Sequence, residues 1–104
     1  MAQNEVRLLH QMKVSLAEFK NEQLGIRRLI DNLESLMNLL QDTLPESEEE
    51  WKSEFWQTWW ILEELYSAAL CRSATQFNDE EWDSIVNAVL KLEEIVQNKI
   101  KDVH

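Results

Sequence analysis

Residues 47–73 constrain the fold more than any other stretch, because they combine dense aromatic content with a helical period. The segment holds four of the five tryptophans and the single tyrosine of the 104-residue chain. Successive helical residues are rotated by about 100°. At that rotation one apolar stripe has the i, i+4, i+7 spacing of an amphipathic helix, and its members are Trp51, Phe55, Trp59, Leu62, Tyr66 and Ala69, with Leu65 and Leu70 on the flanks. We expect this stripe to lie in a protein core.

Two tryptophans of the segment fall off this stripe. Trp56 and Trp60 lie one turn apart on the opposite half of the helical wheel, near Ser53, Glu63 and Glu64. One interpretation packs them against another helix of the same chain, as a second core face. The other exposes them to a partner, since tryptophan is enriched among interface hot spots. An aromatic pair rimmed by carboxylates would suit a basic protein, and a homodimer would also use such a surface.

The first half of the chain repeats apolar residues at alternating spacings of three and four. The register runs from Leu9 to Leu44 through positions 9, 12, 16, 19, 23, 26, 30, 33, 37, 40 and 44, and only Gln23 in it is not apolar. One continuous coiled coil would satisfy this register. We expect a break at 21–25 instead, because Asn and Gly are poor helix-interior residues and Gly25 would serve as a residue that follows a helix C-terminus. The segments 3–20 and 25–43 would then form an antiparallel hairpin.

Local signals predict the bounds of two further helices. Pro45 disfavours helix at the residue before it, and Ser47 with Glu50 has the S-x-x-E spacing of a capping box. A second cap places Asn78 before a helix and Glu81 in its first turn. Phe77 and Trp82 have the spacing of a hydrophobic staple. The stripe that follows contains Trp82, Ile85, Val86, Val89, Leu92, Val96, Ile100 and Val103, with Lys99 and Lys101 near the negative end of the helix dipole.

These patterns predict an all-α fold. Four amphipathic helices at about 3–20, 25–43, 47–73 and 78–101, joined by short connections, make an antiparallel four-helix bundle. A length of 104 residues suits one domain, residues 1–104. The single Gly and single Pro fit long helices, whereas a sheet protein needs many such turn residues.

The charge limits the class of partner. Twenty acidic and ten basic residues leave a net charge of −10, which argues against direct nucleic-acid binding, because phosphate contacts need Lys and Arg clusters. The charge favours a basic protein partner, whose encounter the field would accelerate. The first twenty residues carry charges and no long apolar run, so we expect neither a signal peptide nor a membrane span. We therefore expect a cytoplasmic protein without membrane contact.

Catalytic and metal-binding patterns are missing from the sequence. His10 and His104 have no partner at the spacing of a metal site. Cys71 is the only cysteine, which excludes an intramolecular disulfide. We expect neither an enzyme nor a protein with a cofactor.

The pattern of aromatic and apolar residues resembles a group of small helical bacterial immunity proteins from polymorphic toxin and contact-dependent growth inhibition systems. The resemblance rests on Phe19, Gly25-Ile26, Leu29-Ile30, Leu33-Glu34 and Leu36, followed by Trp51-Lys52, Phe55, Trp59-Trp60, Leu62-Glu63-Glu64, Tyr66, Ala68 and Leu70. It implies a non-enzymatic protein that binds the C-terminal domain of one cognate toxin, often a basic nuclease, and covers its active site or binds beside it.

We therefore predict a surface that binds the toxin domain. Its residues are Trp56, Trp60, Glu63 and Glu64, with Glu48, Glu49, Asp79 and Glu80 as electrostatic contributors at helix N-termini. One alternative is a homo-oligomeric helical adaptor that uses the heptad seam from Leu9 to Leu44. Another is an acidic regulator of a nucleic-acid-binding protein.

Overall fold

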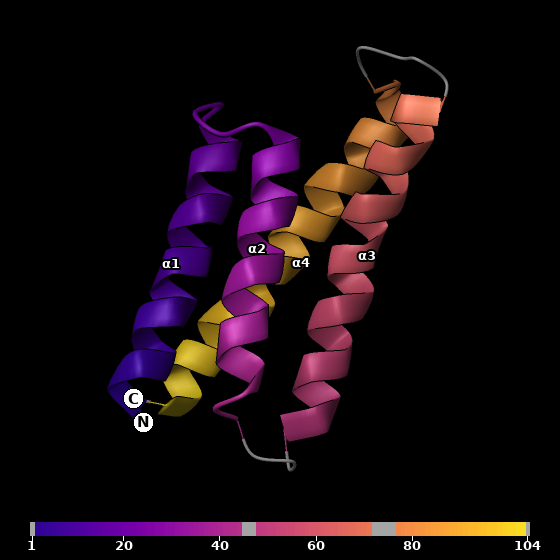
Figure 1. The fold of residues 1–104 in the computed structure, drawn as a ribbon. Helices are drawn as coiled ribbons and strands as arrows, with labels where there is room; N and C mark the ends of the chain where they lie inside the picture. The colour runs from indigo at the N-terminus through magenta and orange to yellow at the C-terminus, as the bar shows by residue number, and fades with distance from the viewer. Residues whose placement is uncertain (1, 45–47, 72–76, 104) are drawn as a thin grey trace.

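The chain folds into antiparallel helices, as the apolar periodicity predicts. The structure, a computed structural model, describes residues 2–44, 48–71 and 77–103. Within these ranges α1 spans Ala2–Lys20, α2 spans Ile26–Gln41, α3 spans Glu49–Cys71 and α4 spans Asp79–Val103. The helices run alternately up and down (Figure 1), and the described residues contain no strand. This confirms the all-α antiparallel four-helix bundle, and the capping box expected at Ser47 lies outside the described residues.

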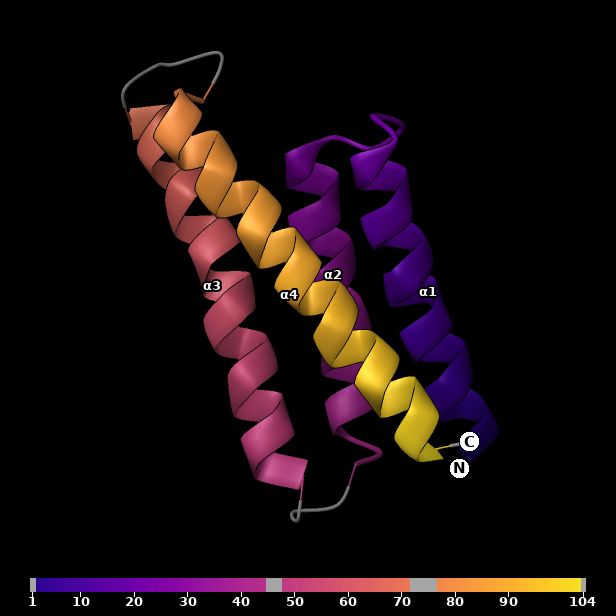
Figure 2. The same cartoon turned by 180° about the vertical axis from the view of Figure 1, so that it is seen from behind.

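The four helices form a ring around one core. Each packs against its neighbours along the chain, α4 packs against α1 to close the ring, and α2 meets α3 less extensively than the other neighbours meet. Helix α4 crosses the bundle diagonally (Figure 2). The side chains with no exposed surface come from all four helices: Leu9, Met12, Leu16, Leu29, Leu33, Met37, Leu40, Phe55, Leu62, Ile85, Leu92 and Val96.

The heptad seam is folded back on itself inside this core. Because α1 ends at Lys20 and α2 returns antiparallel from Ile26, the alternative of one continuous coiled coil is wrong. The seam residues Leu9, Met12 and Leu33 are fully buried within the chain. They therefore offer no surface to a second chain in the folded monomer.

The α1–α2 turn has the hydrogen bonds of a Schellman motif. The backbone N–H of Gln23 donates to Glu18 O over 2.8 Å, and that of Glu22 donates to Phe19 O over 3.1 Å. Glu22 has a φ of 61°, the left-handed conformation that favours glycine. Glutamate thus occupies the position that follows the C-terminus of α1.

Gly25 does not have the expected role after α1. Its φ of −74° and ψ of 160° are extended, and it is the N-cap of α2. The N–H of Leu29 donates to Gly25 O over 3.0 Å and starts the helix. The expectation is wrong because the left-handed residue must follow the last turn of α1 directly, which places it at Glu22.

The start of α4 matches its expected caps. The backbone N–H of Glu81 donates to Asn78 Oδ1 over 2.8 Å, and the N–H of Asn78 donates to Glu81 Oε1 over 3.0 Å. The rings of Phe77 and Trp82 lie 6.5 Å apart, as a hydrophobic staple requires. These contacts confirm the reciprocal cap.

The stripe predicted for α4 needs a correction. Trp82 and Val86 are 47% and 37% exposed, whereas Ala88, Ile95 and Lys99 are buried. Because α4 packs against both α1 and α3, its buried arc centres between these two neighbours. That arc turns away from Trp82 and Val86, whereas Ile85 of the predicted stripe is fully buried.

Replacing Glu22, which has a left-handed backbone conformation, by glycine should stabilise the bundle. Glu22→Gly should raise the free energy of unfolding by about 1 kcal/mol, because glycine adopts a positive φ without a Cβ clash. Glu22→Ala is the matched control, since it removes the carboxylate and keeps the Cβ. Urea denaturation of both variants measures the difference, and equal stabilities would contradict the assignment.

Candidate protein-binding surface

The aromatic side chains of α3 form a row that leads from the core to the surface. Ring centroids are separated by 5.9 Å for Trp51–Phe55, 5.6 Å for Phe55–Trp56, 5.3 Å for Trp56–Trp59 and 6.0 Å for Trp59–Trp60. Phe55 has no exposed surface, and Trp60 is 53% exposed. The row therefore couples an exposed indole to the packed interior.

Two tryptophans of the row attach α3 to its neighbours. Trp59 is 6% exposed, and its Nε1–H donates to the carbonyl of Ile30 in α2 over 3.0 Å. Trp51 is half-buried, and its Nε1–H donates to the carbonyl of Ile95 in α4 over 3.2 Å. The low exposure of Trp59 confirms its predicted core position. The hydrogen bond supplies the acceptor that a buried indole N–H needs.

The structure separates the two tryptophans that lie off the core stripe. Trp56 is half-buried, meets Phe55 and Trp59 edge-on, and donates its Nε1–H to Gln41 Oε1 of α2 over 3.2 Å. It belongs to the packing between α2 and α3. The exposed member of the pair is Trp60 alone.

Trp60 lies on a small apolar and acidic face of α3. Gln57, Trp60, Ile61 and Glu64 have the i, i+3, i+4, i+7 spacing of one helical face, and we call these four residues the Trp60 face. The Trp60 Nε1–H donates to Glu64 Oε1 over 2.9 Å. Ile61 is 43% exposed. The indole is thus held in a fixed orientation while its ring remains accessible.

Glu63 lies on a different face of α3, the one toward α2. It is half-buried, accepts a hydrogen bond from Ser67 Oγ over 3.4 Å, and lines a hollow of about 160 Å³ between α2 and α3. Arg27 of α2 lines the same hollow, 5.9 Å above the Tyr66 ring and 3.6 Å from Asp31. Interactions with Tyr66 and then with Asp31 raise the pKa of Arg27 above its ordinary value. Glu63 is therefore not part of the Trp60 face.

The acidic residues expected to assist binding lie at two opposite ends of the bundle. Glu48 precedes α3 and Glu49 is its first residue. Asp79 and Glu80 are the first two residues of α4, at the other end of the bundle (Figure 1). Glu48 pairs with Lys99, whose side chain is 4% exposed and lies 5.5 Å from the Trp51 ring centroid. Sequence reasoning missed this pair, although Lys99 falls on the buried arc of α4. The structure does not bring these carboxylates to the Trp60 face.

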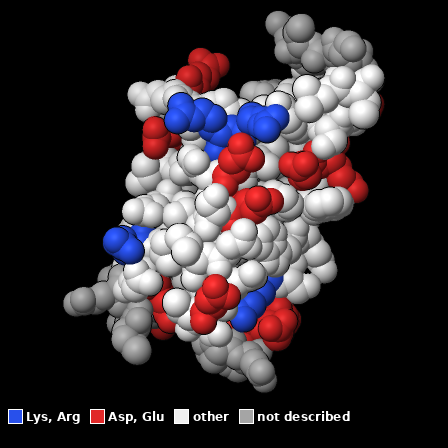
Figure 3. Space-filling model, viewed as in Figure 1, with Lys and Arg blue, Asp and Glu red and all other residues white. Residues whose placement is uncertain are grey.

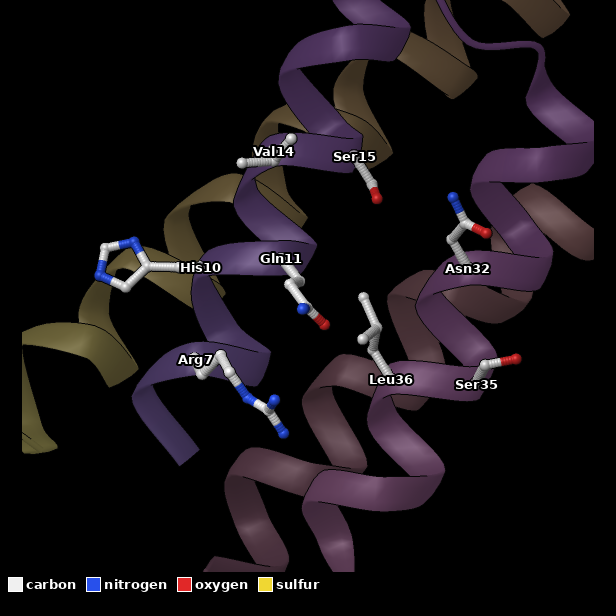
Figure 4. A pocket seen from close by; sticks show the side chains of 8 residues that line it. All are labelled: Arg7, His10, Gln11, Val14, Ser15, Asn32, Ser35 and Leu36. Carbon is white, nitrogen blue, oxygen red and sulfur yellow. The ribbon is translucent and has the colours of Figure 1, made fainter. Parts of the chain in front are cut away.

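A hollow of about 680 Å³ lies between α1 and α2 (Figure 4). It is open and lined by Arg7, His10, Gln11, Val14, Ser15, Asn32, Ser35 and Leu36. Gln11 and Leu36 point toward each other, while His10 points outward (Figure 4). Among the described residues no group of three or more His, Cys, Asp or Glu could hold a metal ion.

The two adjacent tryptophans Trp59 and Trp60 should respond differently to truncation. Trp59→Ala should lower the free energy of unfolding by about 3–5 kcal/mol, as loss of a buried aromatic ring does. Trp60→Ala should change it by less than about 1 kcal/mol, because the ring is half exposed. Thermal and urea denaturation measure both values. A large loss for Trp60→Ala would assign this residue to the core.

The buried lysine should make Glu48 more important for stability than its neighbour. Glu48→Gln should lower the free energy of unfolding by about 1–3 kcal/mol, because it leaves the Lys99 ammonium without its charged acceptor. Glu49 is the control: it is exposed and lies 3.7 Å from Lys52, so Glu49→Gln should have little effect. Equal losses would contradict a structural role for the Glu48–Lys99 pair.

The described helices lack any stretch with the length and apolar character to cross a bilayer. Comparison with protein-family models, curated proteins and solved structures gave no match, so no function comes to this chain from a relative.

Proposed function

We propose that this chain is an immunity protein that binds a cognate bacterial toxin domain and neutralises it in the cytoplasm by stoichiometric protein–protein binding. The observation that carries the proposal is Trp60, a large aromatic side chain that is 53% exposed and yet held in place by Glu64 and Trp59. The resemblance of the helical and aromatic pattern to small immunity proteins supports the same function.

A preoriented tryptophan suits a tight complex. The hydrogen bond to Glu64 and the contact with Trp59 restrict the indole before binding, so less side-chain entropy is lost when a partner pocket closes around it. Ile61 extends the apolar area beside it. Trp60 would therefore act as the anchor, with Glu64 facing a basic group of the toxin.

The net charge of −10 supports a basic partner. On the face seen in Figure 3, acidic and basic groups are interspersed with wide uncharged areas, so the charge is not gathered into one patch there. A distributed negative field speeds the encounter with a basic toxin domain. Apolar contacts then supply the lasting affinity.

Most of the heptad seam from Leu9 to Leu44 is buried inside the chain, while Phe19 and Ile26 are half-buried and Gln23 is exposed. This burial disfavours the homo-oligomeric adaptor. The acidic regulator of a nucleic-acid-binding protein would use the same charge and the same exposed tryptophan. The identity of the partner separates it from the immunity protein.

The first test is copurification of the tagged chain with the C-terminal domain encoded by the adjacent upstream gene, followed by calorimetry. We expect a stoichiometric complex of nanomolar affinity, about −12 kcal/mol, which also protects cells that express the toxin domain. Failure to form a complex with that domain would contradict the immunity function.

Trp60→Ala should weaken this complex by about 2 kcal/mol or more, as loss of a hot-spot tryptophan does. Leu39→Ala is the matched control, because Leu39 is 59% exposed on α2, away from the Trp60 face. Calorimetry with both variants measures the difference. An unchanged affinity for Trp60→Ala would place the toxin contact elsewhere on the molecule.

A further inference from the structure

A second exposed apolar surface lies on α4, away from the Trp60 face. Trp82, Val86 and Leu90 are 47%, 37% and 49% exposed and follow one another at a spacing of four residues. Residues four apart lie on the same side of a helix, so the three side chains form one stripe roughly 12 Å long. We call these three residues the α4 stripe.

The α4 stripe borders a hollow of about 240 Å³ between α4 and the end of α1. Phe19, Lys20 and Glu22 line its α1 side, and the buried Val89 lies behind the stripe. The rings of Phe19 and Trp82 are 6.1 Å apart. Helix α4 diverges from α1 toward the N-terminal end of α4 (Figure 2). The residues of α4 that line the hollow come from this half of the helix.

The charge around this hollow is negative. Among the described residues that line it, the cation Lys20 is already paired with Glu93, with Nζ and Oε1 3.1 Å apart. Asp79 and Asp83 share the exposed side of α4 with the stripe by helical spacing, and neither they nor Glu22 form an ion pair with another described residue. A basic ligand complements this rim, whereas a second copy of this chain or an anionic membrane would be repelled.

The conformation of Glu22 is a second, independent sign. A left-handed φ of 61° is unfavourable for a residue with a Cβ, and glycine would fit the Schellman turn better. Non-glycine residues in this region concentrate at functional sites. Here the strained position carries a carboxylate to the edge of an apolar hollow.

We propose that the hollow and the α4 stripe bind an amphipathic basic helix of a protein partner. Its apolar side chains at i, i+3 or i+4, and i+7 lie along the stripe and enter the hollow, as in other helix-in-groove complexes. Its lysines or arginines face Glu22, Asp79 and Asp83. This surface is separate from the Trp60 face, and the inference does not depend on the immunity function.

Synthetic peptides test the site directly. The first is an 18-residue peptide of leucine and lysine whose leucines follow the helical spacing. The second has the same composition, but its leucines do not fall on one face of a helix. The third has the order of the first with glutamate in place of lysine. NMR of the ¹⁵N-labelled protein follows the indole N–H signals, with Trp82 assigned through Trp82→Phe. We expect only the first peptide to shift the Trp82 signal, and the Trp60 signal should stay in place.

Variants with matched controls complete the test. Leu90→Ala should weaken binding of the first peptide by about tenfold, and Glu22→Ala by about twofold to fivefold. Leu39→Ala and Glu34→Gln remove an exposed leucine and an exposed carboxylate of α2 and should leave the affinity unchanged. Glu22→Gly should weaken binding as Glu22→Ala does, while it stabilises the fold.

Three results would overturn the proposal. One is a shift of the Trp60 signal in place of the Trp82 signal, and another is an equal loss of affinity in the control variants. The third is that the first peptide does not bind at millimolar concentration. Binding of phosphatidylcholine vesicles in place of the peptide would count as this third result, because it would assign the surface to a membrane. Peptide binding at Trp82 without any toxin complex would refute the immunity function and retain this site.

Discussion

The bundle depends on hydrogen-bond acceptors for two indole groups, the buried one of Trp59 and the half-buried one of Trp51. A buried N–H without a partner is costly, and Trp59 and Trp51 find theirs in the backbone carbonyls of Ile30 and Ile95. These two bonds reach helices on opposite sides of α3. They fix the axial position of α3 relative to α2 and α4, because a shift of α3 along its axis would break both hydrogen bonds. The orientation of the exposed Trp60 follows from this arrangement, since it rests on Trp59.

Apolar periodicity predicted the cores of the first three helices because each buries one narrow arc. Leu9, Leu33 and Phe55 lie where the wheel placed them. For α4 the same method placed Trp82 in the core, since a wheel drawn from one helix does not show how its neighbours are oriented around it. The cap at Asn78 was predictable because its partner Glu81 is three residues away. The Schellman turn was not, because glutamate is an uncommon residue for its left-handed position.

The candidate site was only partly predictable for the same reason. Trp56 and Trp60 fall in one half of the wheel, and only the position of α2, which brings Gln41 to Trp56, decides between them. Glu48 and Lys99 are 51 residues apart, so no local spacing pairs them. Part of the negative charge is therefore used inside the fold. The charge left for partners is smaller than the composition indicates, and it lies in separate regions of the surface.

The ring of helices has a consequence for the order of folding. Contacts of α1 with α2, α2 with α3 and α3 with α4 join neighbours along the chain, whereas contacts of α1 with α4 join its two ends. Closing that longest loop costs the most chain entropy, so we expect the α1–α4 contacts to form late, after the local hairpins. Interactions formed after the transition state act on the unfolding rate. We therefore expect the contacts between α1 and α4, among them that of Phe19 with Trp82, to act mainly on the unfolding rate, and the contacts within the hairpins to act mainly on the folding rate.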